Sequence, residues 1–488
     1  MGDGIETIRV AESPAGFQPL NWWKAALLVL GAAACFHAAY TPAHPGPLAL
    51  LIVGYVVCLV QLARMRATRL AFYTGLLTGL ACFGPQLAFF WTIFGPAAVA
   101  LWTILAFWIA LFVALTHVAL VRFGAKRAVW LVPFLWTGLE YFRSELYYLK
   151  FAWLNVGFAF VDFQLLPLPS FGVYGTGFCV TAFATVWLVK KLELSRRIRL
   201  LNVVLTCLFV LTLAGLVFPS LVASKIHPSN FRVAGVQLEF SNRSQIQRAL
   251  DKLVATRTNV DLIVLSEYTL DGPPSEQLKN WCREHGKFLI VGGKDPAPNN
   301  NFYDSAFVIS TNGEVVFKQV KSVPIQFFKD GLRAPEQKLW ESPWGKIGIC
   351  ICYDLSYARV TDELVRQGAQ MLIVPTMDVA DWGRHQHELH ARIAPVRAAE
   401  YGIPIFRVAS SGISQGVDRA GRVCASAPFP GEGEMIFFGV KLNPQRHGSL
   451  PLDRWLAPLC VGVTGLFGLW LAVEKLWRKK LSATDFHR

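Results

Sequence analysis

Eight apolar runs constrain the fold of this chain more than any other feature of its sequence. They lie at 24–41, 47–63, 70–93, 96–121, 128–142, 171–189, 200–222 and 455–474. A helix rises about 1.5 Å per residue and needs about 20 residues to cross a hydrocarbon core of about 30 Å. Most of the runs are close to that length, so the sequence predicts a multi-pass α-helical membrane protein. The run at 128–142 is the shortest, and it carries Glu140.

The composition agrees with a membrane protein and excludes several other classes. Hydrophobic residues make up 53% of the 488 residues and charged residues only 16%, which is too apolar for a soluble protein. The net charge of +14 does not indicate a nucleic-acid partner, because the basic residues stand in short clusters between apolar runs. The ten cysteines form no CxxC pair and no Cys/His cluster, so we expect no metal and no cofactor.

Basic residues fall on every second connection between the apolar runs. The positive-inside rule places such connections in the cytoplasm, so both termini are expected there and the polar region after the seventh run is expected outside. Solvated loop charge, the alternative interpretation, does not explain this alternation. The clusters are Arg64, Arg66 and Arg69; Arg122, Lys126 and Arg127; Lys190, Lys191, Arg196, Arg197 and Arg199; and Lys475, Arg478, Lys479 and Lys480.

These patterns divide the chain into five parts. Residues 1–23 form a cytoplasmic N-terminal segment, 24–222 a seven-span transmembrane domain, and 231–442 an extracytoplasmic domain. A final transmembrane helix at 455–474 and a basic cytoplasmic tail at 475–488 follow. The first run is long and lacks a small-residue cleavage site, so we interpret it as a retained span and not as a signal peptide.

The connection at 143–169 is rich in aromatic and apolar residues, including the stretch FAWLN. Such a composition indicates a segment that lies in the membrane interface rather than in free solvent. Glu140 and Arg143, three residues apart at its start, are interpreted as a structural ion pair, with a substrate contact as the alternative.

Residues 231–442 alternate strand and helix patterns, which predicts an α/β domain with its catalytic groups at strand ends. Asn312–Gly313 lies between two strand patterns and is a hairpin signal. Strands are expected at 231–238, 261–267, 287–293, 305–310, 314–320, 346–352, 371–376 and 403–410, and helices at 244–254, 275–285, 361–367 and 385–401.

Cys352 ends an apolar strand within the stretch KIGICICYDLSY. A thiol at the point where a buried strand meets polar loops suits a nucleophile, provided that its neighbours favour the thiolate. The alternative is a buried, small apolar residue. Cys350 lies two residues earlier, on the same strand face, and is interpreted as a buried bystander.

Two further residue types complete a nucleophilic site. Glu267 ends another buried strand, where a carboxylate can take the thiol proton; the alternative is a surface carboxylate. A lysine that follows the hairpin can stabilise an oxyanion. Lys318 and Lys321 are both candidates, but they lie an odd number of residues apart on a strand and point to opposite faces. Only one of them can enter the site, and counting from the hairpin turn favours Lys321.

Residues 231–442 resemble the nitrilase, or carbon–nitrogen hydrolase, superfamily. The motifs are VLSEYTL, the lysine after the hairpin, ICICYDLSY, and ARIAPVRAAEYGIPIFRVASSGIS. The order of seven spans, this domain and one further span resembles the apolipoprotein N-acyltransferase family. The stretches PFLWTGLEYFRS, FAWLNVGFAF and SFGVYGTGF carry the same resemblance.

The resemblance implies a multi-pass α-helical membrane domain joined to an αββα sandwich. It implies Glu267 as general base, Lys321 as the oxyanion partner and Cys352 as the nucleophile. An acyl chain would pass from a membrane phospholipid to the cysteine, and then to the N-terminal amine of a diacylglyceryl-cysteine in a lipoprotein. The resemblance also implies a location in the bacterial inner membrane, with the catalytic domain on the periplasmic side.

Some positions depart from the family pattern. The usual VPF-Gly-Glu is VPIQFF here, so an expected second carboxylate is missing, and the usual Cys-Tyr-Glu is Cys352-Tyr353-Asp354. Tyr353 and Asp354 are expected to support the site, and Trp382 is expected either to border the acyl pocket or to pack in its loop. Two alternatives to the acyltransferase stay open. One is a membrane-anchored amidase or hydrolase that uses water as acceptor, and the other is a transporter or receptor with an inactive outer domain.

Overall fold

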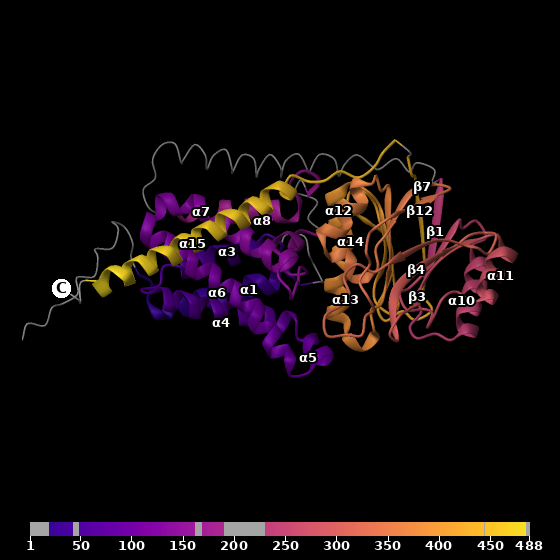
Figure 1. The fold of residues 1–488 in the computed structure, drawn as a ribbon, viewed down its shortest axis with the longest axis horizontal. Coiled ribbons are helices and arrows are strands. Elements are labelled where there is room, and N and C mark those ends of the chain that lie inside the picture. Colours follow the sequence, from indigo (N-terminus) through magenta and orange to yellow (C-terminus); the bar gives the residue numbers. More distant parts are fainter. Residues whose placement is uncertain (1–18, 42–47, 162–167, 190–229, 444, 485–488) are drawn as a thin grey trace, which may run out of the picture.

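The computed structural model describes residues 19–41, 48–161, 168–189, 230–443 and 445–484. Its two parts lie side by side, with a bundle of helices at one end and an α/β domain at the other (Figure 1). The fold class expected from the sequence is therefore confirmed.

Helices form the first part, and one more helix after the α/β domain packs against them. The apolar run at 200–222 lies outside the described residues. Among the described helices, α1, α6 and residues Asp453–Trp477 of α15 are long and apolar enough to cross a membrane. The bundle consists of α1 (Trp22–Ala39), α3 (Leu51–Leu62), α4 (Thr68–Gln86), α5 (Phe89–Phe94), α6 (Ala97–Phe123), α7 (Ala125–Tyr141), α8 (Leu168–Val189) and α15 (Asp453–Thr484).

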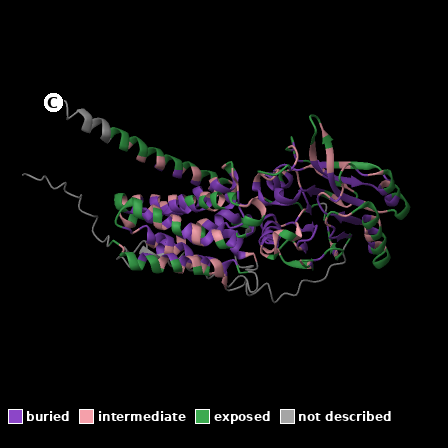
Figure 2. Ribbon diagram, turned by 90° about the horizontal axis from the view of Figure 1, so that it is seen from below, coloured by how far each residue is buried: buried purple, intermediate pink, exposed green. Residues whose placement is uncertain are grey.

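Close packing within the bundle depends on small residues. A Cβ atom added at Gly79 would lie 2.6 Å from the Cα of Ala106, and one added at Gly75 would lie 2.8 Å from the Cα of Ala110. The two glycines are four residues apart and let α4 approach the backbone of α6, as is usual for helices packed in lipid. On the outside, α15 exposes apolar side chains such as Leu466 and Leu469 (Figure 2), as expected of a lipid-facing helix.

Two six-stranded sheets form the core of the α/β domain. The first has the order β12-β1-β2-β3-β4-β5 and the second β11-β10-β9-β8-β7-β6. The strands of the first sheet are β1 (Phe231–Val236), β2 (Leu262–Leu265), β3 (Phe288–Ala297), β4 (Asn301–Ile309), β5 (Val315–Val320) and β12 (Met435–Val440). Those of the second are β6 (Leu339–Ser342), β7 (Gly345–Ile349), β8 (Met371–Thr376), β9 (Ile405–Ala409), β10 (Ser414–Val417) and β11 (Val423–Ala427).

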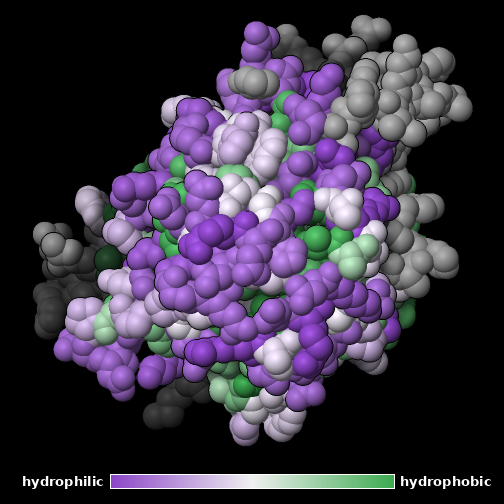
Figure 3. All heavy atoms as spheres, turned by 90° about the vertical axis from the view of Figure 1, so that its right-hand side faces the viewer, coloured by the Kyte–Doolittle hydropathy of each residue, from purple (hydrophilic) through white to green (hydrophobic). Residues whose placement is uncertain are grey.

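The two sheets pack face to face between helices, which gives four layers. Phe406 of β9 and Phe438 of β12 stack across the inner space, with ring centroids 6.2 Å apart. Helices α10 (Arg243–Thr256) and α11 (Glu276–His285) cover the first sheet at the end remote from the bundle (Figure 1). That end presents a mostly hydrophilic surface (Figure 3). Helices α12 (Ala358–Arg366), α13 (Arg384–Ala391) and α14 (Ile393–Tyr401) cover the second sheet and face the bundle.

The hairpin expected around Asn312–Gly313 is present. Strands β4 and β5 pair antiparallel, with Val308 opposite Phe317, and Gly313 takes a φ of +76° in the turn. Such a left-handed backbone favours glycine. The hairpin fixes the register of β5 and hence the direction of the lysines that follow.

The single helix expected at 385–401 is wrong, because the chain forms two helices with a break at Arg392. Pro395 lacks an N–H, and its ring clashes with the carbonyl of the residue four positions earlier, Ala391. Helix α13 ends at that residue. The break also lets Arg392 donate to the carbonyl oxygen of Tyr40 in the bundle, at 3.1 Å.

Residues 151–160 of the connection expected at 143–169 are all buried. Trp153 donates its indole N–H to Oγ of Ser356 at 3.0 Å, and Glu145 accepts the backbone N–H of Ala358 at 3.0 Å. This segment therefore joins the two parts of the chain, and its expected position in the membrane interface stays a prediction.

The expected ion pair between Glu140 and Arg143 is also wrong. Within the described residues, the two side chains form no ion pair with each other; each binds the 151–160 segment instead. Glu140 accepts the backbone N–H of Val156 at 2.9 Å, and Arg143 donates to Oδ1 of Asn155. Buried charged groups need such hydrogen bonds, and here they anchor the connection.

Candidate active site

Glu267, Lys321 and Cys352 each follow a strand, and the two packed sheets bring these strand ends together. Glu267 follows β2 and Lys321 follows β5, both in the first sheet, whereas Cys352 follows β7 in the second. All three side chains are buried, with exposed fractions of 1%, 1% and 3%. The site therefore lies between the sheets, and neither sheet alone could form it.

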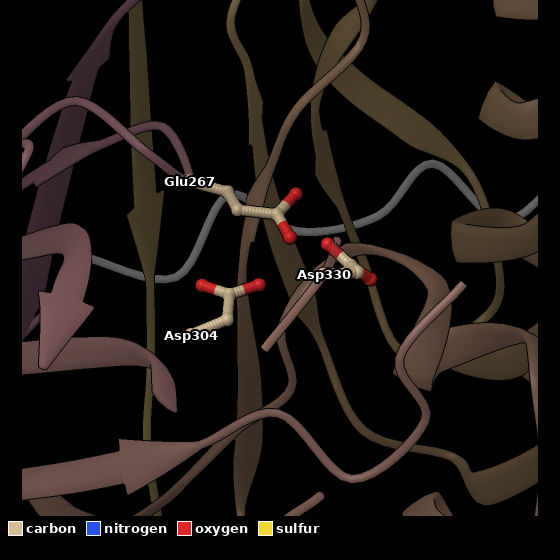
Figure 4. A group of neighbouring side chains, drawn as sticks. All are labelled: Glu267, Asp304 and Asp330. Carbon is tan, nitrogen blue, oxygen red and sulfur yellow. The ribbon is translucent and has the colours of Figure 1, made fainter. Parts of the chain in front are cut away.

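Lys321 is held at the centre of three carboxylates. Its ammonium nitrogen lies 2.6 Å from Glu267, 2.8 Å from Asp330 and 3.3 Å from Asp304. The backbone N–H of Lys321 donates to the carbonyl oxygen of Asp304 at 2.8 Å, which continues the pairing of β5 with β4 and aims both side chains into the site. Figure 4 shows the three carboxylates turned toward one another.

Lys318, the alternative lysine, lies outside this site. Its side chain is 43% exposed and pairs with Asp295, which is 22% exposed, at 2.5 Å. The two lysines were expected to point in opposite directions because they lie an odd number of residues apart on a strand. In the structure, only Lys321 reaches Glu267.

The three carboxylates have the spacing of a cation site, since their ligand atoms lie within 4.8 Å of one another. The cation that they surround is the Lys321 ammonium. Burial alone lowers the pKa of Lys321, but the charges of Asp330, Glu267 and Asp304 raise it well above its usual value. Lys321 is therefore a permanent positive charge beside the cysteine.

Asp304 and Asp330 were not identified from the sequence. Asp304 was detectable in principle, because it is a charged residue in the buried half of strand β4 and buried charges need partners. Asp330 lies in the loop after VPIQFF, and its local sequence carries no signal. It supplies a second carboxylate beside Lys321, although VPIQFF lacks the glutamate usual in the family pattern.

The backbone of Met377 links the carboxylate to the thiol. Its N–H donates to Oε2 of Glu267 at 2.7 Å, and its carbonyl oxygen accepts from Sγ of Cys352 at 3.7 Å. Burial and the charge of Glu267 raise the pKa of the Cys352 thiol well above its usual value, while Lys321 lowers it. The resting cysteine is therefore a thiol, and it needs a base in order to react.

Cys352 sits in a strained turn that Asp354 stabilises. Its φ of +49° is in the left-handed region, which costs a non-glycine residue about 1–3 kcal/mol. The Asp354 carboxylate accepts backbone N–H groups of Ile351, Ser322 and Val323, at distances of 3.3, 3.0 and 2.7 Å respectively. Asp354 therefore ties the turn that carries the nucleophile to the chain that follows Lys321. Burial raises its pKa to about 6, against these hydrogen bonds and the Lys321 charge.

An apolar cavity connects Cys352 with the helical bundle. It encloses about 830 Å³, part of it open to the surroundings, and both parts of the chain line it. Tyr353, which donates its hydroxyl to the carbonyl oxygen of Lys150 at 3.0 Å, lines it beside the cysteine. Trp382, expected either here or packed in its loop, lines it as well. The apolar lining includes Phe89, Phe90, Ile93, Phe94, Leu101, Leu105, Phe151, Trp153, Ile325 and Phe328.

Two family models match this chain. One described as the apolipoprotein N-acyltransferase N-terminal domain matches residues 32–186, and one described as carbon-nitrogen hydrolase matches residues 232–437. The first covers most of the helical bundle apart from α15, and the second covers most of the α/β domain.

Similar proteins share one or both of these parts. An apolipoprotein N-acyltransferase of Geobacter metallireducens is 26% identical over 448 residues, covering 79% of this chain and 84% of that protein. One of Shewanella oneidensis is 25% identical over 389 residues, covering 68% and 73%. An omega-amidase of Saccharomyces cerevisiae is 27% identical over 267 residues, covering 46% of this chain and 90% of that protein. The first two similarities therefore extend over most of the chain, and the third over less than half of it.

Proposed function

Because this chain is a member of the apolipoprotein N-acyltransferase family, we propose that it acylates lipoproteins. The acyl donor is a membrane phospholipid, and the acceptor is the N-terminal amine of diacylglyceryl-cysteine in an apolipoprotein. One observation supports this function above the others: the thiol of Cys352 opens into an apolar cavity built jointly by the α/β domain and the membrane helices.

In the first half-reaction, Glu267 takes the proton of Cys352 and the thiolate attacks the ester carbonyl of the phospholipid. The oxyanion that develops is stabilised by Lys321, whose charge already acts on the thiol. When the C–O bond breaks, Glu267 returns the proton to the departing alcohol of the lysophospholipid. The product is an acyl thioester on Cys352, held in the apolar cavity.

In the second half-reaction, the acceptor amine attacks the thioester carbonyl. The C–N bond forms, the C–S bond breaks, and Glu267 returns one amine proton to the sulfur. The cavity favours this acceptor over water, because its lining is almost wholly apolar and water is the competing nucleophile. A lipid acceptor can enter such a cavity without exposing its acyl chains to water, which would cost about 0.8 kcal/mol per CH₂.

The active site lies on the extracytoplasmic side of the bacterial inner membrane in this proposal. Three contacts near the basic clusters support it. The backbone N–H of Leu20 donates to the carbonyl oxygen of Arg64 at 2.9 Å, His117 hydrogen-bonds the carbonyl oxygen of Ala63, and Arg122 pairs with Glu474. The clusters beside these contacts thus gather at one end of the bundle, and the α/β domain lies at the other (Figure 1). By the positive-inside rule, the basic end is cytoplasmic.

A membrane-anchored amidase or hydrolase is the second candidate, and the similarity to the omega-amidase supports it. The two functions differ only in the acceptor. Purified protein is incubated with phosphatidylethanolamine labelled in its acyl chains, with and without a diacylated lipopeptide. Label on the protein that moves to the peptide amine supports the acyltransferase. Release of free fatty acid alone favours the hydrolase, and a protein that takes up no label contradicts both.

A further inference from the structure

Cys352 shares its cavity with a histidine that the reaction above does not use. His390 on α13 lines the same cavity and is only 3% exposed. The indole ring of Trp153 stacks flat on its imidazole, with ring centroids 4.6 Å apart and an interplanar angle of 13°. The imidazole is therefore fixed in orientation by the bundle on one side and by its own helix on the other.

An aspartate holds one nitrogen of this imidazole. Nδ1 of His390 lies 2.8 Å from Oδ1 of Asp378, and the other carboxylate oxygen of Asp378 accepts from Arg407. Nδ1 also lies 3.0 Å from Nη2 of Arg407. A carboxylate only accepts hydrogen bonds, and the shorter contact, with Asp378, assigns the proton to Nδ1 and leaves Nε2 its lone pair. Nε2 of His390 has no hydrogen-bond partner within the part of the chain that the structure describes.

The charges around His390 suit a base that is neutral at rest. Burial lowers the pKa of His390, Asp378 raises it, and Arg407 and His387 lower it further. Burial raises the pKa of Asp378, but His390 and Arg407 hold it well below its usual range. Cys352, Tyr353 and Lys150 are the other titratable groups that line the cavity. Asp378 thus stays ionised and would stabilise an imidazolium formed beside it.

The proton balance of the second half-reaction requires a second acceptor. An α-amino group has a pKa of about 7.7–8.0, so the acceptor arrives mainly as an ammonium with three N–H bonds. The amide product retains one of them. Glu267 returns one proton to the sulfur of Cys352, which leaves one proton to be removed before the amine can attack.

We propose that Nε2 of His390 removes this proton from the acceptor ammonium and later releases it to solvent, with Asp378 as the positioning residue behind it. The inference rests on the proposed acyltransferase function and adds a catalytic base specific to the amine acceptor. The first half-reaction does not need this base, because Glu267 transfers the thiol proton to the leaving alcohol without a net change.

The two half-reactions are measured separately in the full-length protein with the His390→Gln substitution. Loading of Cys352 from labelled phosphatidylethanolamine is expected to stay within about twofold of the unsubstituted protein. Single-turnover transfer to a diacylated lipopeptide is expected to slow by about tenfold at pH 7, because an amine with a pKa of about 7.7–8.0 is only about one-tenth deprotonated there. The deficit should narrow toward pH 9, where the amine is already deprotonated.

His385→Gln serves as the control, since His385 is another histidine of α13 that hydrogen-bonds Gln86 of the bundle and lies outside the cavity lining. It should keep both steps and the pH profile. A deficit in His390→Gln that is the same at every pH, a loss of loading in that variant, or unchanged transfer would overturn the role of His390. If the unsubstituted protein does not load at all, the proposed function itself fails, and this outcome is distinct from the others.

Discussion

The ammonium nitrogen of Lys321 lies 2.6 Å from Oε1 of Glu267, and both side chains are 1% exposed. The pair places a proton acceptor and a fixed positive charge beside Cys352. Two further carboxylates hold the ammonium in place, so the geometry of the site depends on electrostatics as much as on the strand ends that carry it.

Replacing Lys321 by alanine should abolish loading of Cys352 and destabilise the α/β domain. Removing one partner of a buried ion pair costs roughly 3–5 kcal/mol, and here it leaves three carboxylates without their cation. Lys318→Ala, which breaks an exposed pair, should cost less than about 1 kcal/mol and keep activity. Thermal unfolding in detergent and the loading assay measure both variants. Equal activity of the two variants would contradict the assignment of the lysine.

Asp330→Asn should slow loading by at least about tenfold while the fold is kept. The substitution removes one negative charge beside Lys321, and Asp330 also accepts the backbone N–H of Ile325 at 2.7 Å and the hydroxyl of Tyr268 at 2.8 Å. Asp330 therefore orients both Lys321 and a loop that lines the cavity. Asp295→Asn, in the exposed pair with Lys318, is the control. Loading kinetics that do not differ between these two variants would show that Asp330 has no part in the reaction.

Asp354 should make stability depend on pH in a defined window. Its pKa in the folded state is about 6, above the ordinary value of 3.8, so the folded protein binds this proton more tightly than the unfolded chain does. The stabilisation is complete below about pH 4 and is lost as the pH rises through 6. At about 1.4 kcal/mol per pKa unit, it amounts to about 3 kcal/mol.

The measurement compares thermal unfolding midpoints of the unsubstituted protein and Asp354→Asn from pH 4 to pH 7. The midpoint of the unsubstituted protein should fall relative to that of the variant across this window. Asp381→Asn, at an exposed position nearby, should run parallel to the unsubstituted protein. Parallel curves for Asp354→Asn as well would mean that Asp354 does not titrate there.

Trp382→Ala should raise the KM for phospholipid, because the indole forms part of the cavity lining. A roughly tenfold effect corresponds to about 1.4 kcal/mol of lost binding. Trp382→Phe keeps an aromatic ring and should recover most of it. Initial rates at varied phospholipid content in mixed micelles measure the effect. An unchanged KM in Trp382→Ala would place Trp382 in loop packing alone.

The strand-end positions of Glu267 and Cys352 were predictable from the sequence. Each residue follows a run of apolar residues, and the end of such a run marks the end of a buried strand. The hairpin signal at Asn312–Gly313 likewise gave the register that separates Lys321 from Lys318. These features depend on local patterns of period two and on turn chemistry.

Features that depend on contacts between distant segments were not predictable in this way. Asp330 reaches Lys321 through a loop, and the break at Arg392 is accompanied by a hydrogen bond to Tyr40, more than 350 positions away in the chain. Glu140 and Arg143 bind the 151–160 segment instead of each other. In each case, the partner that decides the outcome lies beyond the reach of a local pattern.

In the proposed reaction Cys352 carries the acyl chain, and trapping that intermediate is a direct test. Protein incubated with acyl-labelled phospholipid, without acceptor, is digested, and the labelled peptide is identified by mass spectrometry before and after hydroxylamine. We predict a hydroxylamine-sensitive acyl group on Cys352 in the unsubstituted protein and in Cys350→Ala, and none in Cys352→Ala. An acyl group that persists in Cys352→Ala, or one that is lost in Cys350→Ala, would contradict the account.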